Sequence, residues 1–317
     1  MTATKLTLPE HQKMMLGKKL IFGSHNLPDN PLFSDEALID LLDNHPRQYL
    51  FALTMGNDPT RPDENMLVQH DGVSGADLLR AVRNGRLWLN ITRVNRADDR
   101  YRALIDLLYS QLAEQAPGFV PRMKQGTLLV SSPGALVYYH VDSPASVLWH
   151  IRGQKRIWVY PALEERFVSR NHLEDLFAGA RHEYLPYDLT LDSGAVVHDL
   201  MPGEWLSWPQ NAPHRITNLG SLNVSLSTEH FTRESIRRAR VYSANRYFRV
   251  RWHMNGLSTA EKTPTAVAKF LAHRVARKLG LDQVEREHRV VRFRVDPDAP
   301  GGFTRLKEGA ERTRSRN

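Results

Sequence analysis

Eight short runs rich in β-branched and aromatic residues lie between residues 126 and 231, and they constrain the fold more than any other feature. Their ranges are 126–134, 136–142, 146–151, 155–161, 194–200, 204–209, 214–218 and 223–231. Turn-forming pairs such as Pro133-Gly134 and Arg152-Gly153 separate several of them. Many short strands at this close spacing predict a β-sandwich or a small barrel, in a chain that is mainly β with flanking helices.

Helices are expected on both sides of this β-rich core. Ser34 and Ser74 are N-cap residues in front of apolar residues at helical spacing, and a third helix is expected from about residue 98 to 115. After the last strand, Pro264 and Gly280 bracket a fourth helix. The segment 163–176 reads as a partly helical insertion.

These patterns divide the chain into four expected parts. Residues 1–120 would form an N-terminal helical region that packs on the barrel, and residues 121–232 would form the barrel core. Residues 233–300 would form a basic helical region, followed by a disordered tail over 301–317.

The composition excludes several kinds of site. The chain of 317 residues contains no cysteine, which removes disulfides, thiolate zinc sites, iron–sulfur clusters and cysteine nucleophiles. No stretch approaches 18 uninterrupted apolar residues, and the N-terminus has no apolar segment behind a basic start. We therefore expect no membrane association and a cytoplasmic location.

The positive charge lies at the C-terminal end of the chain. From Arg233 onward there are 21 Lys and Arg against 9 Asp and Glu, whereas the first 232 residues hold 22 and 26. Such asymmetry can indicate a surface for nucleic acid. The interpretation favoured on the sequence alone is a solvated basic face with a frayed tail.

The residues most indicative of chemistry are His140, Asp142 and His214. Residues two apart in an extended segment project from the same face, so His140 and Asp142 can reach one metal ion. His214 follows a loop that ends in Ala212-Pro213, and a second imidazole completes the 2-His-1-carboxylate pattern of non-haem Fe(II) oxygenases. A single strand histidine is more often structural, so the combination carries the prediction.

Five motifs extend this pattern, and together they resemble those of JmjC/cupin-like oxygenases, notably the bacterial jumonji-type proteins. They are Ser131-Ser-Pro-Gly, His140-Val-Asp142, Ile151-Arg-Gly-Gln-Lys155, Pro202-Gly-Glu and Ala212-Pro-His214. The resemblance covers roughly residues 30 to 250. It implies a double-stranded β-helix (jelly-roll) barrel, Fe(II) as the metal and 2-oxoglutarate as co-substrate. Lys155 stands where the family's lysine binds the distal carboxylate of 2-oxoglutarate, although it could instead be a solvent-facing lysine beyond a hairpin.

Two positions depart from the family's pattern. Val137 stands where the family commonly has Thr or Ser, and Ser146 where it often has Asn. Tyr139 and Thr228 could supply the missing hydroxyl groups for 2-oxoglutarate, with Tyr138, Ser225 and Ser227 as further candidates. His150 could face the barrel interior, although a structural role is favoured.

The resulting hypothesis is an Fe(II)- and 2-oxoglutarate-dependent oxygenase that hydroxylates a protein side chain or a small molecule, or removes an N-methyl group by the same step. An alternative is a metal-binding cupin-like regulatory or interaction module without oxygenase activity. A third is a metal-dependent isomerase or a dioxygenase that uses no 2-oxoglutarate. The C-terminal amphipathic helix could dock on the barrel or form a homodimer.

Overall fold

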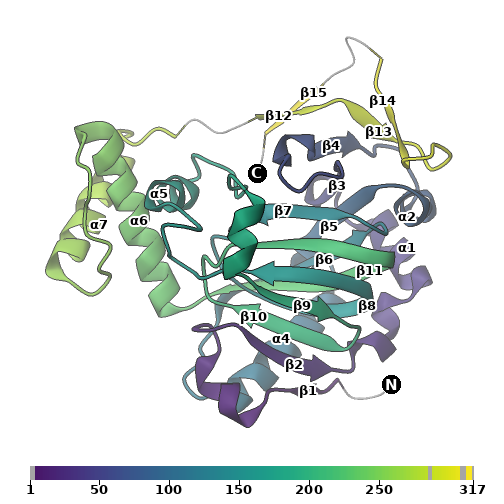
Figure 1. Ribbon diagram of the computed structural model, residues 1–317, viewed down its shortest axis with the longest axis horizontal. Helices are drawn as coiled ribbons and strands as arrows, with labels where there is room; N and C mark the ends of the chain where they lie inside the picture. Colours follow the sequence, from purple (N-terminus) through teal and green to yellow (C-terminus); the bar gives the residue numbers. More distant parts are fainter. Residues whose placement is uncertain (1–3, 285–287, 308–311, 316–317) are drawn as a thin grey trace.

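A single large sheet contains thirteen strands of the structure, a computed structural model that describes residues 4–284, 288–307 and 312–315. Its strands follow the order β1-β2-β10-β8-β11-β6-β5-β3-β4-β13-β14, with β7 beside β11 and β9 beside β8 (Figure 1). The pairs are antiparallel except that β13 runs parallel to β4. The central strands are β6 (Arg122–Ser131), β7 (Leu136–His140), β8 (Ala145–Val159), β9 (Val196–Leu200), β10 (Glu204–Trp208) and β11 (His214–Phe231).

The long strands β8 and β11 organise the sheet because each one belongs to two layers. The C-terminal half of β8 pairs with the N-terminal half of β11, and β9 and β7 flank this pair. The N-terminal half of β8 pairs with the C-terminal half of β11, and β10 and β6 flank that pair. The register shifts between Leu219 and Val224, opposite Gly153 with its φ of 82°. The turn that the sequence predicts at residues 152–153 is therefore an irregularity within one continuous strand, β8.

The expectation of a β-rich protein with flanking helices is confirmed. The pairings between described strands form an open path rather than a closed ring, so the barrel itself is not shown.

One face of the sheet packs on helices from the first part of the chain. α1 (Asp35–Asn44), α2 (Gly75–Asn84) and α4 (Asp99–Gln115) contribute most of the helical residues of the largest core cluster. Ser34 and Ser74 cap α1 and α2 as expected, since each hydroxyl accepts a hydrogen bond from a backbone N–H of the first turn.

The first 120 residues also contain five strands, which the expectation of a helical region missed. They are β1 (Leu6–Thr7), β2 (Ile21–His25), β3 (Leu50–Thr54), β4 (Met66–Gln69) and β5 (Leu87–Thr92). β5 pairs with β6 and β2 pairs with β10, so this region widens the central sheet at both edges. Partners distant in the sequence stabilise these short strands, which are weak signals in isolation.

Three further helices lie at the left of the view in Figure 1, whereas β13 and β14 lie at its upper right. α5 (Arg170–Ala178) is the expected insertion, and α6 (Arg233–Trp252) and α7 (Pro264–Lys278) form a hairpin. Arg249 of α6 binds Glu174 and Asp175 of α5 at 2.6 and 2.7 Å. These ion pairs fix the hairpin to the insertion. No helix in the described ranges is both long and apolar enough to cross a membrane.

The prediction of a disordered tail is wrong for two of its segments. β14 (Phe303–Arg305) pairs with β13 (Phe293–Val295), and β15 (Arg312–Ser315) pairs with β12 (His288–Val291). The backbone of Arg86 donates a hydrogen bond to the carbonyl of Gly301, which ties this part of the chain to α2 and β5. The rest of the predicted tail at 308–311 and 316–317 lies outside the described residues.

Candidate functional site

His140, Asp142 and His214 lie together at one end of the bent sheet. His140 ends β7, Asp142 follows it in the next loop, and His214 begins β11 directly opposite His140. One ligand atom from each residue lies within 4.8 Å of the other two. The Asp142 carboxylate oxygens are 3.8 Å from Nε2 of His140 and 3.6 Å from Nε2 of His214. The structure thus brings together the three residues that the sequence selected.

Backbone carbonyl groups fix the orientation of both imidazoles. Nδ1–H of His140 donates to the carbonyl of Tyr138 at 2.8 Å, and Nδ1–H of His214 donates to the carbonyl of Ala212 at 3.1 Å. Because a carbonyl only accepts, each Nδ1 carries a proton and each Nε2 faces Asp142. Burial and the neighbouring His140 hold the pKa of His214 well below its usual range. Histidines held at Nδ1 in this way are oriented to bind a divalent metal ion through Nε2.

Asp142 is held by side chains from the strand and loop that follow the site in the fold. The hydroxyl of Ser146 donates to Oδ2 of Asp142 at 3.1 Å, and Nδ2 of Asn211 donates to the Asp142 carbonyl at 2.9 Å. The Asp142 side chain keeps 24% of its surface exposed, so a ligand can approach this edge of the group. Ser146, which departs from the family's pattern, therefore orients the carboxylate of Asp142.

Lys155 is the second unusual feature of the interior. It lies on β8 opposite Asn218 and shares a face with Ile157 and Val159, the latter being the cross-strand partner of His214. Only 3% of Lys155 is exposed, so the alternative of a solvent-facing lysine is wrong. No hydrogen bond or ion pair joins its ammonium group to another described residue, and burial lowers its pKa to about 7.

His150 lies beside Lys155 in this interior. Its Nδ1 accepts a hydrogen bond from the hydroxyl of Ser225 at 2.9 Å, and its Nε2–H donates to the carbonyl of Gly153 at 3.0 Å. Burial, together with the nearby Lys155, lowers the pKa of His150 to about 3. The groups near Lys155 are therefore polar but uncharged, and the hydrogen bonds of His150 go to Ser225 and Gly153, in agreement with its favoured structural role.

Two of the expected co-substrate residues point away from this interior. The hydroxyl of Tyr139 donates to the carbonyl of Phe167, and its ring lies in a separate apolar cluster beneath α5. The hydroxyl of Thr228 accepts a hydrogen bond from Nε1 of Trp149 at 2.9 Å, within the helix-covered face. The structure therefore does not bring either hydroxyl group to Lys155, because residues an odd number of positions apart on a strand face opposite sides: Tyr139 adjoins His140, and Thr228 lies three residues from Ser225.

Other residues complete the surroundings of the site without having been selected from the sequence. The ring of Trp208 lies 4.4 Å from that of His214, and the ring of Tyr184 lies 6.2 Å from that of His140. Tyr184 sits in a segment whose backbone bonds to β7, and Nδ2 of Asn65 bonds its hydroxyl group. Asn218, opposite Lys155, donates to the hydroxyl of Ser131 at 2.7 Å. Alternation along 204–208 could have identified Trp208, whereas Tyr184 depends on an irregular loop.

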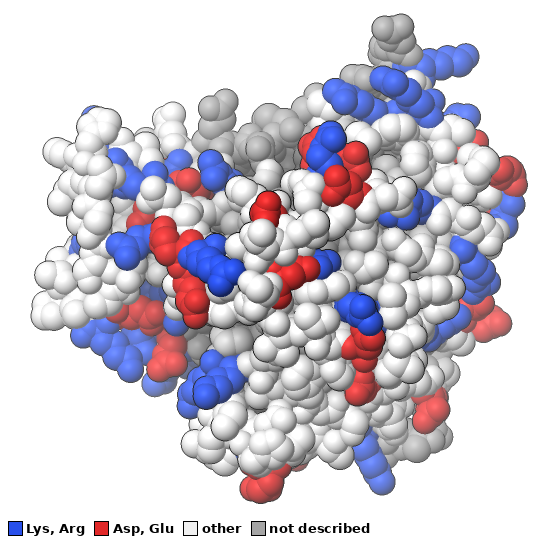
Figure 2. Space-filling model, in the orientation of Figure 1, with Lys and Arg blue, Asp and Glu red and all other residues white. Residues whose placement is uncertain are grey.

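The charged side chains on the face shown in Figure 2 are of both signs, with Lys and Arg lying next to Asp and Glu. Exposed ion pairs of the described residues include Asp199 with Arg156 and Asp63 with Arg61. Exposed pairs contribute little to stability, and their mixture leaves no large region of one sign on this face.

Comparison with known proteins identifies solved structures that share the fold of this chain. No family model matches the sequence, and no curated protein matches it. The structure is similar to that of Escherichia coli ycfD, with a TM-score of 0.50 and 15% identity over 90% of this chain and 74% of that one. A structure described as YcfD, a ribosomal oxygenase from the same organism, in complex with cobalt and 2-oxoglutarate gives a TM-score of 0.46 and 13% identity over 92% and 74%. At such identity the likeness establishes the fold that the chain shares with ycfD and leaves the activity to the residues themselves.

Proposed function

We propose that the chain is an Fe(II)- and 2-oxoglutarate-dependent oxygenase that hydroxylates a protein side chain or a small molecule. The observation that carries the proposal is the combination of a His-His-Asp group with a buried, unpaired lysine on the same interior face. Neither half alone specifies this chemistry, but the two together can hold a chelated metal and a dianionic co-substrate.

The donor set fits Fe(II). Two neutral imidazole nitrogens and one carboxylate that meet from one side leave the remaining coordination positions open, which is typical of non-haem iron oxygenases. The hydrogen bonds from Nδ1 to the carbonyls of Tyr138 and Ala212 are the supporting contacts that metal-binding histidines usually have. His140, Asp142 and His214 would therefore hold the metal.

The environment of Lys155 fits the distal carboxylate of a diacid. Val159 is the strand partner of His214, and Lys155 lies four residues before it, which is about 13 Å along the strand. A ligand that chelates the metal and extends along Ile157 and Ile216 would reach the ammonium group. Pairing with a carboxylate would compensate the desolvation of Lys155, which no described acid does.

Each residue then has a definite part in the reaction. When bound, Fe(II) with 2-oxoglutarate and O2 supplies oxidation of an unactivated C–H bond, with succinate and CO2 as the other products. Lys155 orients the co-substrate, and Ser146 orients the carboxylate of Asp142. Trp208 and Ile216 cover the His214 side of the site and exclude water from it.

The finer features of the fold belong to the same proposal. The strand orders β9-β8-β11-β7 and β10-β8-β11-β6 support the proposal that the core is a double-stranded β-helix. We propose that residues 121–232 form this core, that 1–120 extend it and that 233–300 are an addition to it. E. coli ycfD, whose fold the chain shares, is described as a ribosomal oxygenase, which makes a protein side chain the first substrate class to test. A cytoplasmic location is consistent with such a substrate.

An anaerobic titration tests the proposal directly. Fe(II) followed by 2-oxoglutarate should give a weak visible charge-transfer band in the wild-type protein, and air should then release succinate. His140→Ala should abolish both signals, whereas His11→Ala, an exposed histidine on the surface, should leave both intact.

Three results would separate the alternatives. A metal that binds through His140 without any band or succinate indicates the regulatory module. Metal-dependent chemistry that persists in Lys155→Ala indicates an isomerase or a dioxygenase without 2-oxoglutarate. Succinate formed without iron or with His140→Ala contradicts the proposal outright.

A further inference from the structure

The α6–α7 hairpin carries a concentration of positive charge that its own acids do not neutralise. Residues 233–282 contain twelve Lys and Arg but only three acids. All three acids take part in internal pairs: Glu234 with Arg237 and Lys262, Glu261 with Arg238, and Asp282 with Arg246 and His273. The acids of the hairpin therefore leave most of its basic residues without an internal counter-charge.

Seven of these basic side chains have no acid within ion-pair distance among the described residues. They are Arg233, Arg240, Arg251, Lys269, Arg274, Arg277 and Lys278, of which Lys269 donates to Oδ1 of Asn245 and to the carbonyl of Ser258. By contrast, Arg246 and Arg249 bind the acids of α5 and serve to attach the hairpin. The unpaired charges are thus distinct from the structural ones.

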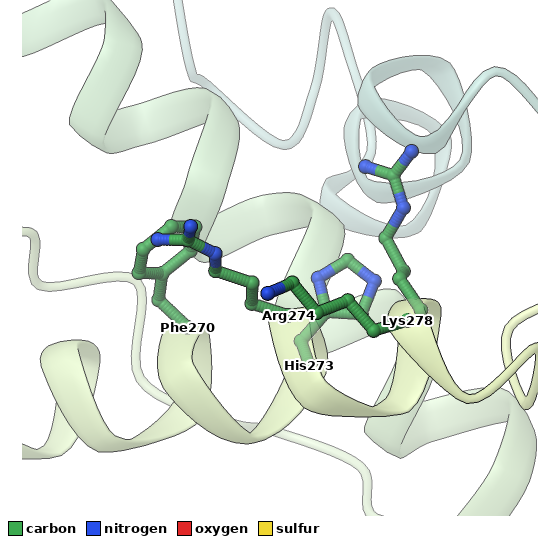
Figure 3. A pocket seen from close by; sticks show the side chains of 5 residues that line it. Phe270, His273, Arg274 and Lys278 are labelled. Carbon is green, nitrogen blue, oxygen red and sulfur yellow. The ribbon is translucent and has the colours of Figure 1, made fainter.

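Three of the seven lie around one hollow on α7. Arg274, Arg277 and Lys278 line a hollow of 340 Å³ together with Phe270 and His273. Figure 3 shows Phe270, Arg274 and Lys278 following one another along the helix, with His273 behind them. One helical turn, about 6 Å, separates each of these three from the next. Phe270, Arg274 and Lys278 therefore form a row along the helix that a ligand in the hollow could contact.

The row combines two kinds of chemistry. Guanidinium groups bind phosphate oxygens through paired donors, and a lysine adds a compact positive charge. Phe270 supplies an aromatic ring, and the guanidinium of Arg240 from α6 lies 4.7 Å from the centre of that ring. Stacking rings beside a positively charged groove are the means by which proteins bind single strands without reading their sequence.

From this arrangement we infer that the α7 hollow binds the sugar–phosphate backbone of a single-stranded nucleic acid, with Arg274, Arg277 and Lys278 on phosphates and Phe270 against a base. The site is separate from the metal-binding group, since its residues belong to α7 alone. It is independent of the proposed oxygenase activity. It also replaces the interpretation of the basic quarter as a merely solvated face.

The apolar residues next to the hollow raise a rival occupant. Val267, Leu271 and Val275 are exposed on the neighbouring side of α7. Such a row also suits a second copy of the chain or a lipid surface. A second copy of the chain would bring like charges together. An anionic lipid surface would attract the same cations, whereas a single-stranded nucleic acid uses both the cations and the ring of Phe270, which can stack on a base. The rivals become outcomes of the test.

The test is fluorescence anisotropy of a labelled twelve-nucleotide single-stranded RNA, titrated with the full chain to roughly 100 μM at several salt concentrations. The wild-type protein should bind, and the triple variant R274E/R277E/K278E should weaken binding at least about tenfold. Its slope of log affinity against log salt should be shallower by about 2, since each phosphate contact contributes roughly 0.7 for single strands. R274Q/K278Q tests the same contacts with a smaller perturbation if the triple variant fails to fold.

A control with the same change in net charge removes the general effect of charge. K18E/K19E/R122E alters exposed residues far from α7 in the sequence and should change affinity less than about twofold. The inference is overturned by equal losses in both triple variants, by no binding of RNA, or by equally tight binding of a polyglutamate peptide. Two other outcomes also overturn it. One is hollow-dependent sedimentation with phosphatidylserine-containing vesicles without RNA binding, and the other is a hollow variant that changes only the oligomeric state.

Discussion

Replacing Lys155 with methionine should stabilise the metal-free protein while destroying its affinity for 2-oxoglutarate. Methionine keeps the unbranched shape and removes the charge. In the folded state burial lowers the pKa of Lys155 from 10.5 to about 7, whereas the unfolded chain restores the ordinary value. At pH 7 the wild-type fold therefore carries a penalty of about 4 kcal/mol for this group, from 1.36 kcal/mol per pKa unit. Substitution should recover a large part of it.

The dependence on pH distinguishes this electrostatic cause from a simple packing effect. Between pH 7 and 10.5 the unfolded state holds a proton on Lys155 that the folded state has released, so the wild-type free energy of unfolding rises with pH in that window. Below pH 7 both states are protonated and the full penalty remains. The variant's advantage should thus be largest at pH 6 to 7 and shrink by about 3 kcal/mol by pH 9.5.

Urea unfolding of the metal-free wild-type and variant proteins at pH 6, 7, 8 and 9.5 measures this difference, and other titrating groups cancel in the comparison. Calorimetric titration of the Co(II)-loaded proteins with 2-oxoglutarate measures the second effect. Removing the partner of a buried carboxylate costs about 3–5 kcal/mol, so affinity should fall more than 100-fold. A stability difference that is constant from pH 6 to 9.5, or unchanged 2-oxoglutarate affinity, refutes the reasoning.

Three further predictions follow from single contacts. Ser146→Ala should weaken Co(II) binding by about 10- to 100-fold in an equilibrium titration, because it frees the Asp142 carboxylate, while Ser193→Ala on the surface should not. Tyr139→Phe and Thr228→Val should leave 2-oxoglutarate affinity within about twofold by calorimetry, and a loss comparable to that of Lys155→Met would restore them to the site. Arg249→Met should lower the free energy of unfolding by about 3–5 kcal/mol in urea, because it leaves a buried acid of α5 unpaired. A change below about 1 kcal/mol would mean that the α5–α6 pairs do not hold the hairpin.

The grouping of His140, Asp142 and His214 could be predicted because its signal is local. His140 and Asp142 are two residues apart, and β-alternation brings them to one side whatever the rest of the chain does. The pairing of His214 with His140 needed the order of strands, which the turn residues between the runs indicate. The capped helices after Ser34 and Ser74 were likewise predictable from their first turns.

The co-substrate wall was less predictable because it depends on which face each strand turns inward. The same alternation places the side chain of Tyr139 on the opposite face of the strand from that of His140. A register shift between β7 and β11, however, places Val137 opposite Ile216 and His140 opposite His214. Three positions along β7 therefore match two positions along β11. That irregularity brings Val137 to the interior and sends Tyr138 and Tyr139 elsewhere. Neither propensity nor spacing indicates such a shift, because it arises from pairing with a distant strand.

The strands at the edges of the sheet were missed for a related reason. β4 and β13 are four and three residues long, and they pair although most of the chain separates them. A short strand gains stability from its partners rather than from its own residues. The tail was predicted to be disordered because its stabilising contacts, at Gly301 and Gly302, lie with α2 and β5.

Charge balance links the two anion-binding sites proposed for this chain. Salt bridges neutralise several partly buried cations elsewhere: Arg215 with Asp192, Arg238 with Glu261, and Arg249 with Glu174. Among the described residues, Lys155 in the interior and the three cations around the α7 hollow have no such acid. A buried cation without an acid destabilises the fold, and unpaired surface arginines repel one another. Both costs are relieved by a ligand that carries the missing negative charge, a compact diacid in one place and an extended polyanion in the other.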